Sequence, residues 1–380
     1  MTDIFVSSDN IVSPIGFTAA ENFAQLKQNV SGIGLHDDAL MSAQPFYAAL
    51  FADDNKIGNN DESWAGYTKF EKLLITSIGD ALANSSINAT DKDTVLIISS
   101  TKGNISLLET ETPSPSLQER ISLHHSARLV ADHFQFAHEP VIVSNACISG
   151  ILAMLTGMRL IQSGQYRHAV VAGADVISKF VLSGFQSFQA VSTGPCKPFD
   201  AARTGINLGE GAGTVILTVD KAFSSGIQIS GGSVSNDANH ISGPSRTGEE
   251  LYQAISNAIK ASGIHAEVID LISAHGTATL FNDEMEAKAI NLAGLQNVPV
   301  NSLKGYYGHT LGAAGLIESI ISFYSLKENL VIPTRGFEHM GVTQPVNICA
   351  RLYETPLQHC LKTASGFGGC NAAMVFSKHD

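Results

Sequence analysis

The sequence places a cysteine where a strand gives way to a helix. Cys147 follows the apolar run 141–143, and apolar residues continue at helical spacing to residue 161. A helix that begins here directs free N–H groups and the positive end of its dipole at the sulfur, which favours a nucleophilic thiolate. A buried structural cysteine is the alternative interpretation, because free cysteine is among the most buried residue types.

Two histidines occupy comparable corners in the second half of the chain. His275 follows the predicted strand 268–274 and is itself followed by a glycine. His309 also adjoins a glycine, and it opens the predicted helix 309–326. Each histidine could instead be a core residue with satisfied hydrogen bonds, and the small residues of the helix start could simply allow close packing.

A lysine and a glycine-rich turn complete the set. Lys304 lies between the predicted strand 298–303 and the helix that starts at His309. The turn 366–371 precedes the predicted strand 372–376, and its backbone can aim an N–H at a developing oxyanion. Four glycine-flanked stretches therefore supply a thiol, two imidazoles, an ammonium group and an oxyanion donor.

Alternating strands and helices must hold these groups in place. The pattern of apolar residues indicates a layered α/β fold. Residues 34–64 are polar and acidic, so we expect an exposed, irregular excursion there. The other predicted strands cover 4–7, 95–99, 168–174 and 213–219, and the other predicted helices cover 19–26, 67–84, 127–136 and 250–263.

Internal similarity links two halves of the chain. The predicted helix 250–263 and strand 268–274 repeat the order of the earlier helix 67–84 and strand 95–99. In each half a second strand then leads into a long helix whose start carries a reactive residue type. Chance similarity among α/β segments is the alternative, but the shared order favours two copies of one unit.

With these motifs the chain resembles a β-ketoacyl-[acyl carrier protein] synthase of the elongating, decarboxylating type. Besides the four stretches above, the resemblance rests on Ser-Pro-Ile-Gly at 13–16, Pro-Phe-Asp at 198–200 and the glycine-rich run 205–213, and it covers nearly the whole chain. It implies a thiolase-like α/β fold with five layers, αβαβα, built from two duplicated α/β halves. We place these halves at 1–222, with the nucleophilic cysteine, and at 223–380, with the histidine pair.

The resemblance implies an activity and the residues that perform it. The activity is a decarboxylative Claisen condensation of an acyl thioester with malonyl-[acyl carrier protein] to 3-oxoacyl-[acyl carrier protein], without a cofactor or a metal. By resemblance, Cys147 accepts the acyl group, and His275 and His309 promote decarboxylation and stabilise the enolate. Lys304 would orient this pair, with Glu286 as its buried carboxylate partner.

The same resemblance assigns binding groups. The N–H groups of Cys147 and Phe367 would form the oxyanion hole, and Thr277 and Thr279 would contact the phosphopantetheine arm of the carrier. Ser365 is also assigned to substrate binding. It stands where the family usually has an aromatic residue, so we expect a wider and wetter acyl site.

Two further departures from the family pattern concern the acyl pocket. Cys370 replaces a more usual threonine or histidine, and the segment between residues 103 and 141 is shortened. The chain length and saturation of the acyl group therefore stay open, as does the choice between a fatty acid pathway and a polyketide or polyene pathway.

Composition narrows the class of protein. The chain has 380 residues, 44% of them hydrophobic and 15% charged, which is typical of a compact globular protein. Its five cysteines include no CxxC pair, which argues against a disulfide framework and fits a reducing cytoplasm. The net charge of -12 disfavours nucleic-acid binding. No apolar run is long enough to span a bilayer, so we expect a soluble, unexported protein.

The expected partner is an acyl carrier protein that bears phosphopantetheine. An acidic carrier needs a local basic patch on this acidic chain, and we assign docking to Lys69 and Lys72 on the predicted helix 67–84. A merely solvated helix face is the alternative for these two lysines. We also expect a dimer, either of two copies or with a related ketosynthase-like subunit.

Other functions fit parts of the sequence. The CoA-primed or chalcone-synthase branch has Cys, His and Asn, whereas this chain has His309 in the third place. A silent chain-length subunit usually lacks the nucleophile, and a carrier-binding module would not need it. A dinucleotide site fails because the run 209–213 leads into a predicted strand. The adjacent residues His124 and His125 make only a weak metal site.

Overall fold

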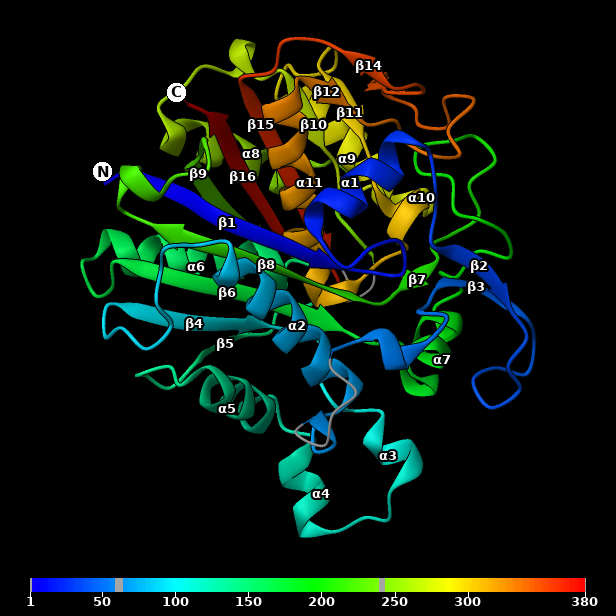
Figure 1. Cartoon of the computed structure of the whole chain (residues 1–380). Helices are drawn as coiled ribbons and strands as arrows, with labels where there is room; N and C mark the ends of the chain where they lie inside the picture. Colours follow the sequence, from blue (N-terminus) through cyan, green and yellow to red (C-terminus); the bar gives the residue numbers. More distant parts are fainter. Residues whose placement is uncertain (1, 59–63, 239–242, 380) are drawn as a thin grey trace.

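The computed structural model describes residues 2–58, 64–238 and 243–379. Its largest element is a sheet of eleven strands in the order β13-β11-β10-β15-β16-β9-β1-β8-β6-β4-β5. In Figure 1 the first half of the chain runs from blue to green and the second from yellow-green to red, with β1 and β9 at the junction. These two strands pair antiparallel and join the halves into one sheet.

The first half contributes five strands to the sheet. Strand β1 is antiparallel to β8, β8 is antiparallel to β6, and β6, β4 and β5 run parallel. Their buried residues form almost continuous apolar runs, as expected for strands covered on both faces. The strands are β1 (Ile4–Val12), β4 (Thr94–Ser99), β5 (Val141–Val143), β6 (His168–Asp175) and β8 (Gly211–Thr218).

The second half repeats this arrangement strand for strand. Strand β9 is antiparallel to β16, β16 is antiparallel to β15, and β15, β10 and β11 run parallel. The predicted duplication is therefore confirmed by order and direction as well as by pattern. The strands are β9 (Ile227–Asn236), β10 (Leu271–Ser273), β11 (Pro299–Asn301), β15 (His359–Gly366) and β16 (Cys370–Lys378), with β13 (Asn347–Ile348) added at the edge.

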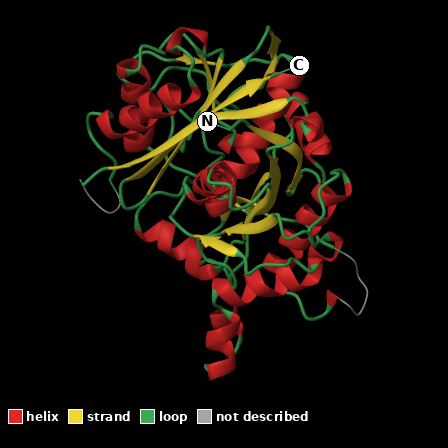
Figure 2. Ribbon diagram, turned by 90° about the vertical axis from the view of Figure 1, so that its left-hand side faces the viewer, coloured by secondary structure: helices red, strands yellow, loops and turns green. Residues whose placement is uncertain are grey.

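Two equivalent helices form the central layer. α6 (Ser149–Gln162) follows β5, and α11 (Ala314–Glu328) follows β11 after the short helix α10 (Lys304–Tyr307) and a 3-10 turn. The helices approach closely because glycine faces glycine: a Cβ on Gly150 would lie 2.9 Å from the backbone nitrogen of Leu316. Figure 2 shows one helix end-on between two groups of strands. The largest apolar cluster lies here, between the two half-sheets.

Helices also cover the two outer faces. α2 (Lys69–Ala83) and α5 (Leu123–Phe134) pack on the first half, and α8 (Glu249–Ser262) and α9 (Leu280–Leu292) pack on the second. Together with the two half-sheets and the central helices they make five layers, which confirms the predicted thiolase-like architecture. The division into 1–222 and 223–380 as domains stays a prediction.

The expectation of an irregular excursion over 34–64 is wrong for part of that stretch. β2 (Ile33–His36) and β3 (Phe46–Ala49) form an antiparallel pair, and β3 continues into a parallel pair with β7 (Leu208–Gly209). The strand signal was hidden because the apolar partners of β3 lie far away in sequence, on α7 (Lys179–Ser187). Residues 59–63 of the predicted excursion lie outside the described residues.

The remaining elements are short or peripheral. α3 and α4 project from the body at one end of the molecule in Figure 1. Among the described residues, no helix combines the length and apolarity needed to cross a membrane. The short or peripheral elements are α1 (Ala19–Lys27), η1 (Asp54–Lys56), α3 (Leu107–Thr110), α4 (Pro115–Arg120), η3 (Lys221–Phe223), η4 (Ala266–Val268), α10 (Lys304–Tyr307), η5 (Leu311–Ala313), β12 (Leu330–Val331) and β14 (Tyr353–Glu354).

Candidate active site

Cys147 lies at the predicted corner, between the end of β5 and the first turn of α6. The turn is sharp: Ala146 has a φ of 43°, a left-handed conformation that costs a residue with a side chain about 1–2 kcal/mol. The hydroxyl of Ser149 holds it, because it accepts the N–H of Asn145 (2.8 Å) and donates to the carbonyl of Ala146 (2.6 Å). This strained corner fixes the sulfur at the N-terminus of α6.

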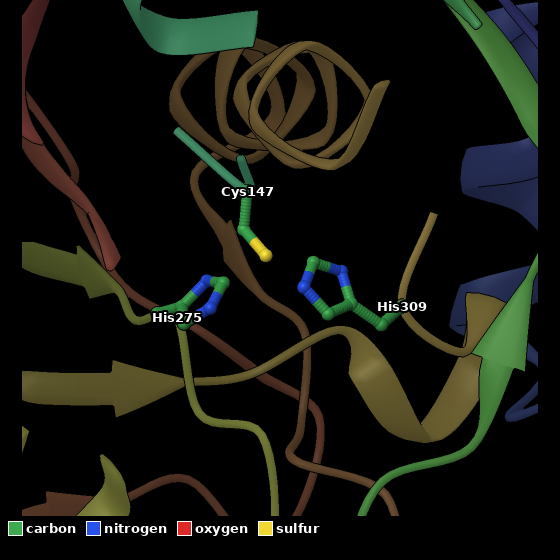
Figure 3. A group of neighbouring side chains, drawn as sticks. All are labelled: Cys147, His275 and His309. Carbon is green, nitrogen blue, oxygen red and sulfur yellow. The ribbon is translucent and has the colours of Figure 1, made fainter. Parts of the chain in front are cut away.

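The thiol and the two imidazoles come together from three separate segments. The sulfur of Cys147 and one ring nitrogen of each of His275 and His309 all lie within 4.8 Å of one another. The two rings are nearly perpendicular, at 81°, with centroids 5.2 Å apart. Figure 3 shows the sulfur directed between the two rings. All three side chains are buried, so their chemistry takes place away from bulk water.

Burial sets the resting protonation of this group. It raises the pKa of the Cys147 thiol to about 12, an effect to which the Cys370 thiol adds and which Lys304 opposes. The expectation of a resting thiolate is therefore wrong, since loss of hydration outweighs the helix terminus. Burial, reinforced by Lys304, also holds the pKa of His275 and His309 well below the usual 6.5. The resting site contains a thiol and two neutral imidazoles.

Backbone contacts decide which nitrogen of His309 carries the proton. The N–H of Leu311 donates to Nδ1 of His309 at 3.2 Å, so the proton of the neutral ring resides on Nε2. Nε2 of His309 and Nδ1 of His275 are buried and have no partner among the described residues. Unpartnered polar atoms are rare in protein interiors, so both await a group that enters the site.

The predicted pairing of Lys304 with Glu286 is wrong. The ammonium of Lys304 instead forms an ion pair with Glu318 and donates to the carbonyl of His275 (3.0 Å). Glu286, from α9, accepts the N–H groups of His275 and Gly276, both at 2.8 Å. Glu318 was recognisable as a lone carboxylate in the apolar helix 309–326.

The loop after β15 approaches Cys147 from the other side. A Cβ on Gly366 would lie 3.0 Å from the nitrogen of Cys147, so only glycine fits there. The N–H of Phe367 forms a hydrogen bond with the Cys147 thiol that lowers its pKa. The ring of Phe367 lies 5.6 Å from that of Phe185 and 5.2 Å from that of Phe188, measured between centroids.

A cavity of about 470 Å³ opens above the three reactive side chains. Thr277 and Thr279 line it, and their hydroxyl oxygens are 2.8 Å apart. Ser365 also lines it, with its hydroxyl donated to Oδ1 of Asn371 at 2.7 Å. Exposed apolar side chains, among them Phe281, continue the lining outward. The cavity therefore combines a polar interior with an apolar wall, as expected for an acyl thioester and its carrier arm.

Lys69, one of the two predicted docking residues, is not free to bind a carrier. Its ammonium lies 2.7 Å from Oδ1 of Asp54 and 2.5 Å from Oε1 of Glu210, and its side chain is only 27% exposed. We therefore withdraw Lys69 from the predicted docking pair, because its ammonium already pairs with two carboxylates. Lys72, one turn along α2, is half-buried, and its role stays a prediction.

The rival sites differ from the Cys147 site in geometry. The glycine-rich run 209–213 leads into β8, which confirms that it opens a strand and not a helix. His125 lies 3.5 Å from Glu119 on α4 and faces no cluster that could hold a metal within the described residues. Cys147 and the two histidines are close enough for a cation, but the buried ammonium groups of Lys304 and Lys362 oppose one there.

The chain belongs to the beta-ketoacyl synthase family. The model of the beta-ketoacyl synthase N-terminal domain matches residues 1–222, and that of the C-terminal domain matches residues 227–338. A 3-oxoacyl-[acyl-carrier-protein] synthase 2 from Rhizobium meliloti (strain 1021) is 33% identical over 254 residues, 62% of this chain and 60% of that relative. The aligned region thus spans about three fifths of the relative's length.

Solved structures confirm the fold. A ketosynthase, ApeO, in complex with its chain length factor, ApeC, from Xenorhabdus doucetiae has a TM-score of 0.88 and 24% identity, covering 99% of this chain and 98% of that one. The ishigamide ketosynthase/chain length factor has a TM-score of 0.89 and 22% identity, with both chains fully covered.

Proposed function

We propose that this chain is an acyltransferase, a 3-oxoacyl-[acyl carrier protein] synthase that condenses a Cys147-bound acyl group with malonyl-[acyl carrier protein]. One observation carries the proposal: the buried sulfur of Cys147 lies within 4.8 Å of a nitrogen of two neutral imidazoles. The sequence relatives named as synthases of this type support the same reaction. A silent chain-length subunit or a carrier-binding module would not need a buried thiol between two neutral imidazoles.

Acyl transfer is the first half-reaction. The Cys147 sulfur forms a bond to the thioester carbonyl carbon, the carrier sulfur leaves, and the thiol proton passes to it by way of an imidazole. His275 is the ring suited to relay that proton, because Nδ1 of His309 is already engaged by Leu311. The N–H groups of Cys147 and Phe367 would stabilise the oxyanion, which typically contributes about 3 kcal/mol for each well-placed donor.

Decarboxylation is the second half-reaction. The malonyl thioester loses carbon dioxide, and the electron pair of the broken C–C bond moves onto the thioester oxygen. The Nε2–H of His309 is a donor without a partner, so it can receive this enolate oxygen, with His275 as the second donor. The enolate carbon then bonds to the acyl carbonyl carbon on Cys147. The bond between that carbon and the Cys147 sulfur breaks, which releases the product. Loss of carbon dioxide supplies the carbanion, so no strong base is needed.

Leucine variants of the two histidines separate these steps. His309→Leu and His275→Leu remove enolate donors, so malonyl decarboxylation should fall by about two to three orders of magnitude. Acylation of Cys147 from an acyl carrier should fall much less in His309→Leu, because the wild-type ring of His309 has no proton-accepting nitrogen free. Equal losses in both steps for His309→Leu would contradict this division of roles.

An acyl carrier protein and a second ketosynthase-like subunit are the partners we propose. Complexes of both kinds occur among the structural neighbours, whose titles name a chain length factor and a type II PKS acyl-carrier protein. The native mass of the chain expressed alone separates a dimer of two copies from a required second subunit. Carrier docking at Lys72 predicts that Lys72→Glu raises the Michaelis constant for the carrier, whereas an unchanged constant would remove this residue from the docking surface.

A reducing cytoplasm is the compartment we propose. All five cysteines are free and buried, and the thiol chemistry of Cys147 requires that they stay reduced. Measuring the free thiols of the protein isolated under anaerobic conditions tests this: five are expected, and fewer would contradict it.

A further inference from the structure

A second buried lysine lies below the catalytic histidines. Lys362 is on β15, directly opposite Ser273 of the parallel neighbour β10. Its side chain is completely buried. Burying an ammonium group is costly unless it is paired and hydrogen-bonded, so such a residue needs an explanation.

The contacts of Lys362 lead directly to His275. Its ammonium donates to the carbonyls of Ser273 (3.1 Å), Ala274 (3.3 Å) and Thr363 (2.8 Å). Ser273 and Ala274 are the last two residues before His275. Lys362 therefore fixes the backbone from which the imidazole projects with two hydrogen bonds from one charged group, and its third goes to the next residue of its own strand.

The same ammonium completes a balanced set of buried charges. Lys362 lies 2.7 Å from Oε2 of Glu318, while Lys304 pairs with the other oxygen of that carboxylate. Glu286 is the second buried carboxylate, and it accepts the hydroxyl of Thr363 at 2.6 Å. Two cations and two carboxylates thus lie beneath the imidazole pair.

We propose that Lys362 is a positioning residue for the reaction: it orients the His275 loop and supplies the second cation beneath the two imidazoles. Its kinetic consequences rest on the proposed condensation function, whereas its effect on the imidazoles does not. The titratable and charged groups around this site are Cys147 before α6, Asp175 at the end of β6, Asp283 and Glu286 on α9, Lys304 on α10, Glu318 on α11 and Lys362 on β15, and Asp283 is itself paired with Arg203 at 3.8 Å.

The direction of the effect follows from Coulomb's law. Burial is the largest cause of the lowered pKa of both His275 and His309, Lys304 lowers it further, and Lys362 acts in the same direction. Removing its charge leaves one cation against two carboxylates, so the net charge under the rings becomes negative. The pKa of both imidazoles should then rise. Protonation of His309 would place a proton on Nδ1, so this nitrogen could no longer accept the N–H of Leu311.

Four variants separate charge from packing. Lys362→Met removes charge and hydrogen bonds, and Lys362→Gln removes the charge but keeps an amide that can donate to the carbonyls. Lys362→Met combined with Glu318→Gln removes one cation and one carboxylate, and so restores the balance. Lys260→Met, at an exposed position in the last turn of α8, controls for loss of a lysine elsewhere.

The readout is the titration of the two imidazoles by NMR in protein labelled with carbon-13 histidine, with resonances assigned from His275→Gln and His309→Gln. Both titrations should move upward by about one pH unit in Lys362→Met and Lys362→Gln, return in the double variant, and stay at the wild-type position in Lys260→Met. Folded Lys362→Gln with unmoved titrations would overturn the proposal, as would an equal shift in Lys260→Met.

A kinetic measurement connects the titration to the reaction. The acidic limb of the pH profile of the malonyl decarboxylation rate should move by the same amount as the imidazole titrations. If the wild-type chain does not decarboxylate malonyl carrier at all, the proposed function fails, and the NMR result still decides the role of Lys362. If the wild-type chain is active and the limb does not follow the titrations, the kinetic part of the inference is wrong.

Discussion

Glu286→Gln tests the reassigned role of this carboxylate. In the wild type Oε1 accepts the N–H of His275 and the hydroxyl of Thr363, and Oε2 accepts the N–H of Gly276. A glutamine can keep one of these oxygens, but its NH₂ group must then face at least one N–H donor. The variant loses a hydrogen bond to a charged group and leaves a buried N–H unsatisfied, which together cost roughly 3 kcal/mol.

This cost converts into a measurable shift in thermal stability. A chain of 380 residues has an unfolding entropy of about 0.8 kcal/mol per degree, so roughly 3 kcal/mol lowers Tm by about 4 °C. The loop that carries His275 should also shift, and a displacement of about 1 Å can cost a hundredfold in rate. Scanning calorimetry and malonyl decarboxylation measure the two effects.

Thr363→Val is the matched control for this variant. It removes only the hydroxyl donor to Glu286 and leaves both backbone hydrogen bonds to the carboxylate, so it should lower Tm by about 1 °C and leave the decarboxylation rate within a few-fold. If Glu286→Gln behaved like Thr363→Val, the claim that Glu286 positions the His275 loop would be refuted.

Three further predictions concern pH, the acyl site and the central layer. Since the pKa values of His275 and His309 lie well below 6.5, malonyl decarboxylation should hold its rate from about pH 8 to about pH 6.5 and fall only under more acidic conditions; a midpoint near 6.5 would contradict neutral resting rings. Ser365→Phe should change the ratio of elongation rates on saturated and polyunsaturated acyl carriers of equal length, and an unchanged ratio in folded, acylated protein would show that Ser365 does not set substrate choice. Gly150→Ala should destabilise the fold by about 1–3 kcal/mol in chemical denaturation, because its Cβ would meet backbone atoms of α11, and wild-type stability would contradict the close approach.

Local patterns predicted the positions of the reactive groups well. The corner at Cys147, the strand ends that carry the histidines and the duplicated order of elements all depend on short-range periodicity. Such periodicity is set by residues within one helix turn or one strand, so a single sequence displays it directly.

Partnerships between distant residues could not be obtained in this way. Which carboxylate meets Lys304 depends on the packing of α9 on the outer face and α11 in the central layer, and from the sequence we named only Glu286. Lys362 was overlooked because no strand was predicted over β15, and an isolated lysine is ordinarily taken as solvent-facing. The resting state of Cys147 was also misjudged, since burial depends on the whole fold whereas a helix start is a local feature.

The most direct test of the central claim is mass spectrometry of Cys147 during turnover. After incubation with an acyl carrier protein, the acyl mass should appear on the peptide that contains Cys147. Addition of malonyl carrier should then remove it and yield a carrier-bound 3-oxoacyl product two carbons longer. The Cys147→Ala variant should show neither event. Acylation of a different residue, or condensation by Cys147→Ala, would contradict the assignment of Cys147 as the nucleophile.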